Sequence, residues 1–165
     1  MIINKRDSTN VNFERGKENW EKRANKNNIY DSLKYLTKAI NENGENLERS
    51  KLMSQACHFT AEYIEDDETK SDSLYLLGKD TAWSFLIKTD SYIEGFNKFS
   101  GDLAGKKIAG IDNISENDIE VLFWWVKNYV SFIANKPVTE RLNAREEIET
   151  ALYRVLSQKP DFYFG

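Results

Sequence analysis

The side chains that could do acid–base or metal chemistry in this chain meet on one short stretch. His58 and Glu62 are four positions apart, which places them on one face of a helix. The chain has one His and one Cys, whereas protein metal sites usually take three or four strong ligands. Cys57 is adjacent to His58, so on a helix it points to another face. The pair therefore predicts a partly buried histidine hydrogen-bonded to its neighbour, and we expect no metal and no cofactor.

A second feature with chemical consequences is a concentration of carboxylates after the histidine. Net charge is +3 over residues 1–60, −8 over 61–120 and +1 over 121–165, and −4 for the whole chain. A field of this kind attracts a basic protein partner and repels nucleic acid. The segment lacks the spacing, central Gly and terminal Glu of an EF-hand, so calcium is not expected. The side chains expected to bind the partner are Glu62, Glu65, Asp66, Asp67, Glu68 and Asp72.

The place of these carboxylates on a helix gives a reason to consider binding. A helix expected over about 46–65 would end among them, and the dipole at a helix C-terminus disfavours negative charge. An arrangement that opposes local stability favours a binding role. The alternative is an ordinary solvated helix end.

Trp124 and Trp125 are the third candidate feature. Adjacent helical residues point about 100° apart, so both indoles can hardly face the centre of one core. The apolar residues around them form a broad face, which predicts a central, surrounded helix. The functional alternative is that one indole, assigned to Trp124, reaches an interface, where Trp is a common hot spot.

The elements that must position these residues are helices. Apolar spacing predicts an all-α fold, an irregular antiparallel bundle of about six or seven helices. No fixed period recurs, so a helical repeat is not expected. Residues 101–113, with Gly101, Gly105 and Gly110, are expected to form one long loop. The helices are expected over about 13–25, 29–40, 46–65, 71–86, 91–99, 115–133 and 139–156, with Gly44 closing the second and Ser71, Ser115 and Thr139 as N-caps.

Length and composition bound the remaining properties. At 165 residues we expect a single helical domain over 1–165, with 1–12 as an N-terminal arm. We expect the aromatic tail from Pro160 to Gly165 to fold back onto the bundle. A single Cys allows no intramolecular disulfide, no signal-peptide pattern opens the chain, and no apolar run approaches a membrane span. We therefore expect a cytoplasmic monomer or weak dimer that does not enter a membrane.

Three functional hypotheses follow. A small acidic helical protein with many aromatic residues and no catalytic set is similar in type to the immunity proteins of bacteria, although no motif carries the likeness. It would occlude a basic, nuclease-like toxin domain. The alternative is a scaffold or regulatory module that binds a peptide or helix in an apolar groove. The third is a helical-bundle enzyme that uses His58 and Glu62.

Overall fold

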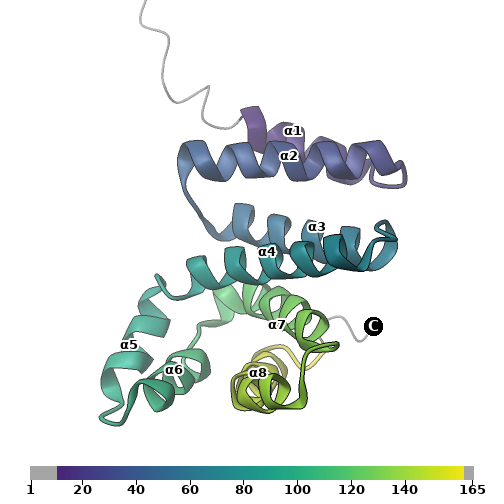
Figure 1. Cartoon of the computed structure of the whole chain (residues 1–165). Helices are drawn as coiled ribbons and strands as arrows, with labels where there is room; N and C mark the ends of the chain where they lie inside the picture. Colours follow the sequence, from purple (N-terminus) through teal and green to yellow (C-terminus); the bar gives the residue numbers. More distant parts are fainter. Residues whose placement is uncertain (1–10, 162–165) are drawn as a thin grey trace, which may run out of the picture.

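The computed structural model describes residues 11–161, and this part of the chain is all-α (Figure 1). It contains eight α-helices and a short 3-10 helix, without strands, so the predicted fold class is confirmed. The helices are α1 (Val11–Glu21), α2 (Lys26–Asn43), α3 (Leu47–Tyr63), α4 (Glu68–Leu86), α5 (Asp90–Lys98), α6 (Leu103–Asp112), α7 (Ile119–Ile133) and α8 (Val138–Gln158), with η1 (Glu116–Asp118) before α7.

The helices pack as sequential pairs, α1 with α2, α3 with α4, α5 with α6, and α7 with α8. The first pair lies on α3, and α4 in turn packs on α7. The α5/α6 pair is set to one side and reaches α8 through α6 (Figure 1). The helices differ in length, from the 9 residues of α5 to the 21 residues of α8, so the arrangement of the pairs is irregular.

Short polar side chains start most of these helices. Each accepts a hydrogen bond from a backbone N–H of the first turn, which satisfies a donor that the helix itself leaves free. Gly44 closes α2 as predicted, with φ of 73° and its N–H donating to the Ile40 carbonyl at 2.8 Å. The capping side chains are Asn25, Asn46, Asp67, Thr89 and Asp102 for α2 to α6.

Three predicted helix starts are wrong by a few residues. The fourth helix begins at Glu68 because Asp67 caps it, and Ser71 instead donates its hydroxyl to the Ala61 carbonyl at 3.1 Å. Ser115 opens the 3-10 turn and donates to Asp118 at 2.8 Å, so α7 itself starts later. The last helix follows Pro137 directly instead of starting after Thr139.

The long loop predicted for residues 101–113 is wrong, because most of it is helix α6. Asp102 caps this helix by accepting from the Gly105 N–H at 2.8 Å. Ile111 is fully buried, and Lys107 pairs with Glu147 of α8 at 2.7 Å. Packing against α5 and α8 therefore stabilises a helix whose glycines disfavour it locally.

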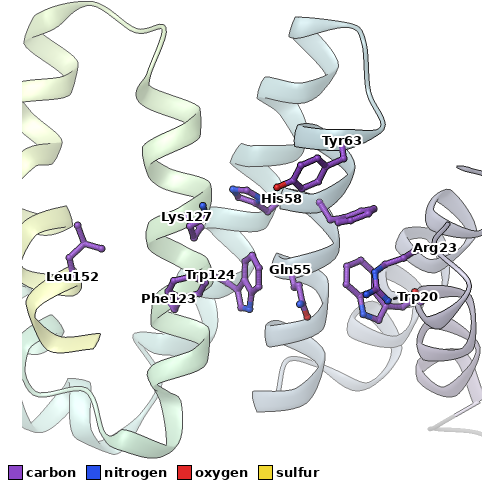
Figure 2. Close-up of a pocket in the computed structure, with 10 residues that line it drawn as sticks. Trp20, Arg23, Gln55, His58, Tyr63, Phe123, Trp124, Lys127 and Leu152 are labelled. Carbon is purple, nitrogen blue, oxygen red and sulfur yellow. Dashed lines mark hydrogen bonds between the residues drawn. The ribbon is translucent and has the colours of Figure 1, made fainter. Parts of the chain in front are cut away.

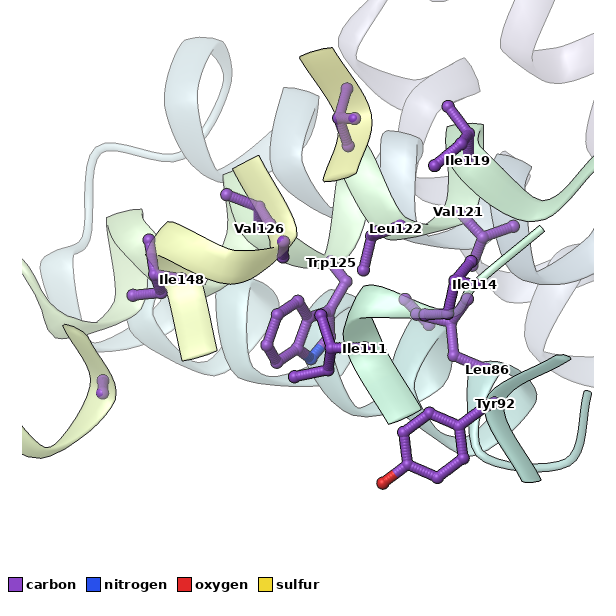
Figure 3. Packing of buried hydrophobic residues seen from close by; sticks show 14 residues of the cluster. Leu86, Tyr92, Ile111, Ile114, Ile119, Val121, Leu122, Trp125, Val126 and Ile148 are labelled. Carbon is purple, nitrogen blue, oxygen red and sulfur yellow. The ribbon is translucent and has the colours of Figure 1, made fainter. Parts of the chain in front are cut away.

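Two buried clusters hold the fold together. The larger cluster surrounds Trp125 and contains residues of every helix from α4 through α8 (Figure 3). The smaller joins α1 to α3 around Leu36 and Met53. No described helix has the length and apolar character needed to cross a bilayer.

Part of the chain is not covered by this description. Residues 1–10 of the expected N-terminal arm lie outside the described residues, whereas Val11 and Asn12 already belong to α1. Residues 162–165 of the aromatic tail lie outside them as well.

Candidate functional site

An aromatic groove of about 500 Å³ lies between α1, α3, α7 and α8 (Figure 2). Its walls are mostly aromatic, and its polar groups are few, as in sites that bind ligands or protein segments. The residues that line this aromatic groove are Trp20, Arg23, Gln55, His58, Phe59, Tyr63, Phe123, Trp124, Lys127 and Leu152.

Arg23 and the rings around it form one wall. The Arg23 guanidinium lies 4.5 Å from the Trp20 ring centroid and 5.8 Å from that of Phe59. Its Nη1 donates to the Trp20 carbonyl at 3.1 Å. Trp20 and Phe59 meet edge to face at 5.5 Å. A cation next to aromatic rings is attracted by them without an ion pair.

His58 lies deeper in the groove, only 5% exposed, and its Nε2 has no hydrogen-bond partner in the described part of the chain. Its ring lies 5.5 Å from that of Tyr75 and 5.8 Å from that of Trp124. Burial, reinforced by the positive charge of Lys127, lowers the pKa of His58 from 6.5 to about 4. The imidazole is therefore neutral near pH 7.

The predicted hydrogen bond between His58 and Glu62 does not form. Glu62 instead accepts from the Tyr75 hydroxyl at 2.6 Å. Burial and this bond raise the pKa of Tyr75. Glu62 thus neither orients the imidazole nor receives a proton from it, so this geometry offers no support for acid–base catalysis by the pair.

The two adjacent tryptophans are separated as their helical spacing predicts. Trp125 is buried and stacks on Trp83 at 5.1 Å, inside the larger core cluster. Trp124 is half-buried and lines the aromatic groove. That it contacts a partner stays a prediction.

The six predicted carboxylates lie at one end of the α3/α4 pair, and we call this set the acidic end. The set is divided between α3, the connection after it and the first turns of α4, because α3 ends at Tyr63. The expectation that the cluster as a whole opposes a helix dipole is therefore wrong. Asp67 caps α4 by accepting from the Lys70 N–H at 3.1 Å, and Glu68 lies in its first turn, where negative charge is favourable.

Most carboxylates of the acidic end have a partner within the fold. Glu65 accepts from the Tyr30 hydroxyl of α2 at 2.8 Å, and this bond, followed by the bond from the Asp67 N–H, lowers the pKa of Glu65. Asn135 donates to Glu68 at 3.1 Å, and Lys136 pairs with Asp72 at 2.6 Å. The acidic end therefore also connects α2 and the segment between α7 and α8 to the α3/α4 pair.

Sequence reasoning selected one residue of the aromatic groove, Trp124, as a partner contact. Trp20 and Arg23 are three positions apart, and Phe59 and Tyr63 are four apart, so each pair shares a helix face. These spacings were available as a signal, but nothing in the sequence indicates that the two faces meet.

A second apolar cavity, of about 550 Å³, lies between α4, α5 and α6 around Trp83, Phe96 and Leu103.

Neither metal binding nor known relatives add information about the site. Residues 11–161 contain no cluster of three or more His, Cys, Asp or Glu side chains that could hold a metal ion. No family model, curated protein or solved structure matches this chain.

Proposed function

We propose that this protein binds and occludes a basic protein partner, in the manner of a bacterial immunity protein. The aromatic groove would form the centre of the interface, and the acidic end would pair with Lys and Arg side chains beside it. The observation that carries the proposal is the continuity of these two surfaces along α3.

Helix α3 contributes to both surfaces. Phe59 and Tyr63 line the aromatic groove, and Tyr63 is 70% exposed. Glu62 is adjacent to Tyr63, and Glu65 and Asp66 follow directly after the helix. An aromatic centre with a charged margin is the usual anatomy of a protein interface.

The mechanism would be steric and electrostatic. Asp66, Asp67 and Glu68 are exposed, so their carboxylates can pair with the basic side chains that a nuclease uses to hold phosphates. Opposite charges accelerate association, to about 10⁸–10⁹ M⁻¹s⁻¹ at low salt. The partner's substrate site would then be covered without any chemical step.

The test removes charge from the acidic end while retaining its hydrogen bonds. In the variant E65Q/D66N/D67N/E68Q, the amide introduced at position 65 can still accept from Tyr30. The amide introduced at position 67 can still cap α4, since asparagine caps as well as aspartate. A basic partner isolated with the wild-type protein should bind this variant at least about tenfold more weakly. Its affinity should also depend less on salt, because exposed charges are screened.

A matched variant controls for the change in net charge. D90N/D102N/D112N/E146Q removes four carboxylates from α5, α6 and α8, and the amide introduced at position 102 retains the cap of α6. This variant should bind the partner as the wild-type protein does. Equal binding by the acidic-end variant, at low and at high salt, would remove the acidic end from the interface.

A second candidate function is a module that takes a peptide or helix in the aromatic groove alone. The size and aromatic lining of the groove favour it. In that case Trp124→Ala should abolish binding while the acidic-end variant binds normally and salt has little effect.

A further inference from the structure

The charges around the aromatic groove are opposite in sign to those of the acidic end. Arg23 and Lys127 line the groove, and no carboxylate does. The chain as a whole carries −4, so this cationic lining is a local departure from the net charge. A surface of this kind attracts anionic groups.

Arg23 retains donors for such a group. A guanidinium has five N–H donors, and one hydrogen bond, to the Trp20 carbonyl, is made within the described residues. The rings of Trp20 and Phe59 lie next to it, at 4.5 and 5.8 Å from the guanidinium carbon. A preorganised guanidinium is well suited to bind a carboxylate through two parallel hydrogen bonds.

Lys127 lies across α3 from Arg23 (Figure 2). It is exposed, it follows Trp124 by three positions on α7, and it forms no ion pair with any residue of the described range. The two cations therefore flank the aromatic side chains from opposite sides.

His58 places a polar atom without a partner beside the aromatic side chains of the groove. It is about 95% buried among the groove residues, and its Nε2 is left without a partner in the described part of the chain. A buried polar atom without a hydrogen bond is uncommon in native folds, so the groove keeps a polar group beside its aromatic rings.

We infer that the aromatic groove receives an acidic–apolar–acidic segment of the protein partner. A large apolar side chain would enter between Trp20, Phe59 and Trp124, with one flanking carboxylate on Arg23 and the other on Lys127. This inference rests on the proposed function and names the chemistry of the partner's central segment. Alternating signs, cationic in the groove and anionic at the acidic end, would fix the orientation of the partner.

The experiment titrates a short peptide, acetyl-Ser-Glu-Ala-Phe-Ala-Glu-Ser-amide, into the full chain. Since the chain has one histidine, the ring protons of His58 give a unique NMR signal inside the groove. We expect saturable shifts of this signal and of the Trp124 indole N–H. A peptide with Gln in place of both Glu residues, and one with Ala in place of Phe, should each bind at least about tenfold more weakly.

Two protein variants complete the test. Lys127→Gln changes an exposed side chain and should weaken the Glu peptide about tenfold, whereas the matched Lys34→Gln on exposed α2 surface should have no effect. Arg23→Gln should weaken it further, with circular dichroism to verify the fold. Equal binding of the Gln peptide, an unchanged affinity in Lys127→Gln, or no shift at millimolar Glu peptide would overturn the inference.

The outcomes separate this inference from the proposed function. If the basic partner is lost with the acidic-end variant but binds Lys127→Gln normally, the proposed function stands and the acidic segment is wrong. If the peptide binds but the partner binds the acidic-end variant as tightly as the wild type, the groove is a site for an acidic segment. The proposal of occlusion through the acidic end is then wrong.

Discussion

At the scale of single residues, hydrogen-bond partners decide what each ionisable group can do. Glu62 is four positions from His58, yet it is bound by Tyr75 from the neighbouring helix. His58 is consequently a buried neutral imidazole instead of half of an acid–base pair. Its environment makes the stability of the fold depend on pH.

We predict that acid destabilises the protein through His58. The pKa of His58 is about 4 in the fold and 6.5 in an ordinary environment. Between these pH values the imidazole is protonated in the unfolded chain and neutral in the folded chain. The stabilisation is complete above pH 6.5 and is lost as pH falls towards 4. It amounts to at most about 3 kcal/mol. Urea unfolding at pH 4–7, together with the NMR titration of the single histidine, measures it.

The control is His58→Gln, which removes the titration at this position. Its free energy of unfolding should fall less steeply between pH 6.5 and 4 than that of the wild type. Parallel curves, or ring signals that titrate near pH 6.5, would contradict the prediction.

At the scale of elements, close contacts between helices constrain residues that local rules would treat as replaceable. Asn128 of α7 donates to the Ser54 carbonyl of α3 at 2.9 Å and to the Trp124 carbonyl at 2.8 Å. Ser54 in turn donates to the Gly78 carbonyl of α4 at 2.9 Å. This buried polar contact joins three helices at one point.

Gly78→Ala should therefore destabilise the protein, although Gly to Ala in an exposed helix usually stabilises by about 0.5–1 kcal/mol. A Cβ at Gly78 would lie 2.6–2.7 Å from the Asn128 amide atoms, and moving that amide breaks its two hydrogen bonds. We expect a loss of about 1–3 kcal/mol by chemical unfolding.

A double variant identifies the cause. Gly78→Ala combined with Asn128→Ala should cost less than the sum of the two single changes, since the contact is then already absent. Strict additivity, or a stabilised Gly78→Ala, would show that α4 and α7 have room to separate.

At the scale of the whole molecule, the two buried clusters stabilise different parts of the fold, the smaller one α1 to α3 and the larger one α4 to α8. The α1/α2 pair packs on the rest of the described fold chiefly through α3. Helix α7, by contrast, contacts α3, α4 and α8 and supplies the largest share of the larger cluster. The α1/α2 pair contains Trp20 and, in the turn between the two helices, Arg23. This pair should therefore be able to separate from α3 while the rest of the fold stays intact.

Hydrogen exchange should resolve this opening. Amides of α1 and α2 should exchange before those of α7 under native conditions, because local opening needs less free energy than global unfolding. Leu36→Ala, in the smaller cluster, should speed exchange in α1 and α2 and leave α7 nearly unchanged. Uniform exchange in all helices, with and without the substitution, would mean that the fold opens as one unit.

The sequence by itself determined the helical class and most helix positions. Apolar side chains at helical spacing, such as Leu33 and Leu36 or Leu122 and Val126, report which face must be buried, and Gly44 reports where a helix stops. These signals are local, because they depend on residues within one or two turns. The different directions of the Trp124 and Trp125 side chains are likewise a local property, because they follow from the helical geometry of adjacent residues.

Only the tertiary structure decided the remaining features. Asp102 gives α6 a local start, but its glycines disfavour a helix, and the cover that α5 and α8 provide is a tertiary contact. The aromatic groove requires side chains from Trp20 to Leu152 to converge, and the partners of Glu62, Glu65 and Asp72 lie on other elements. Such contacts depend on how whole helices pack, and the packing free energy is shared among many distant residues rather than encoded in any short segment.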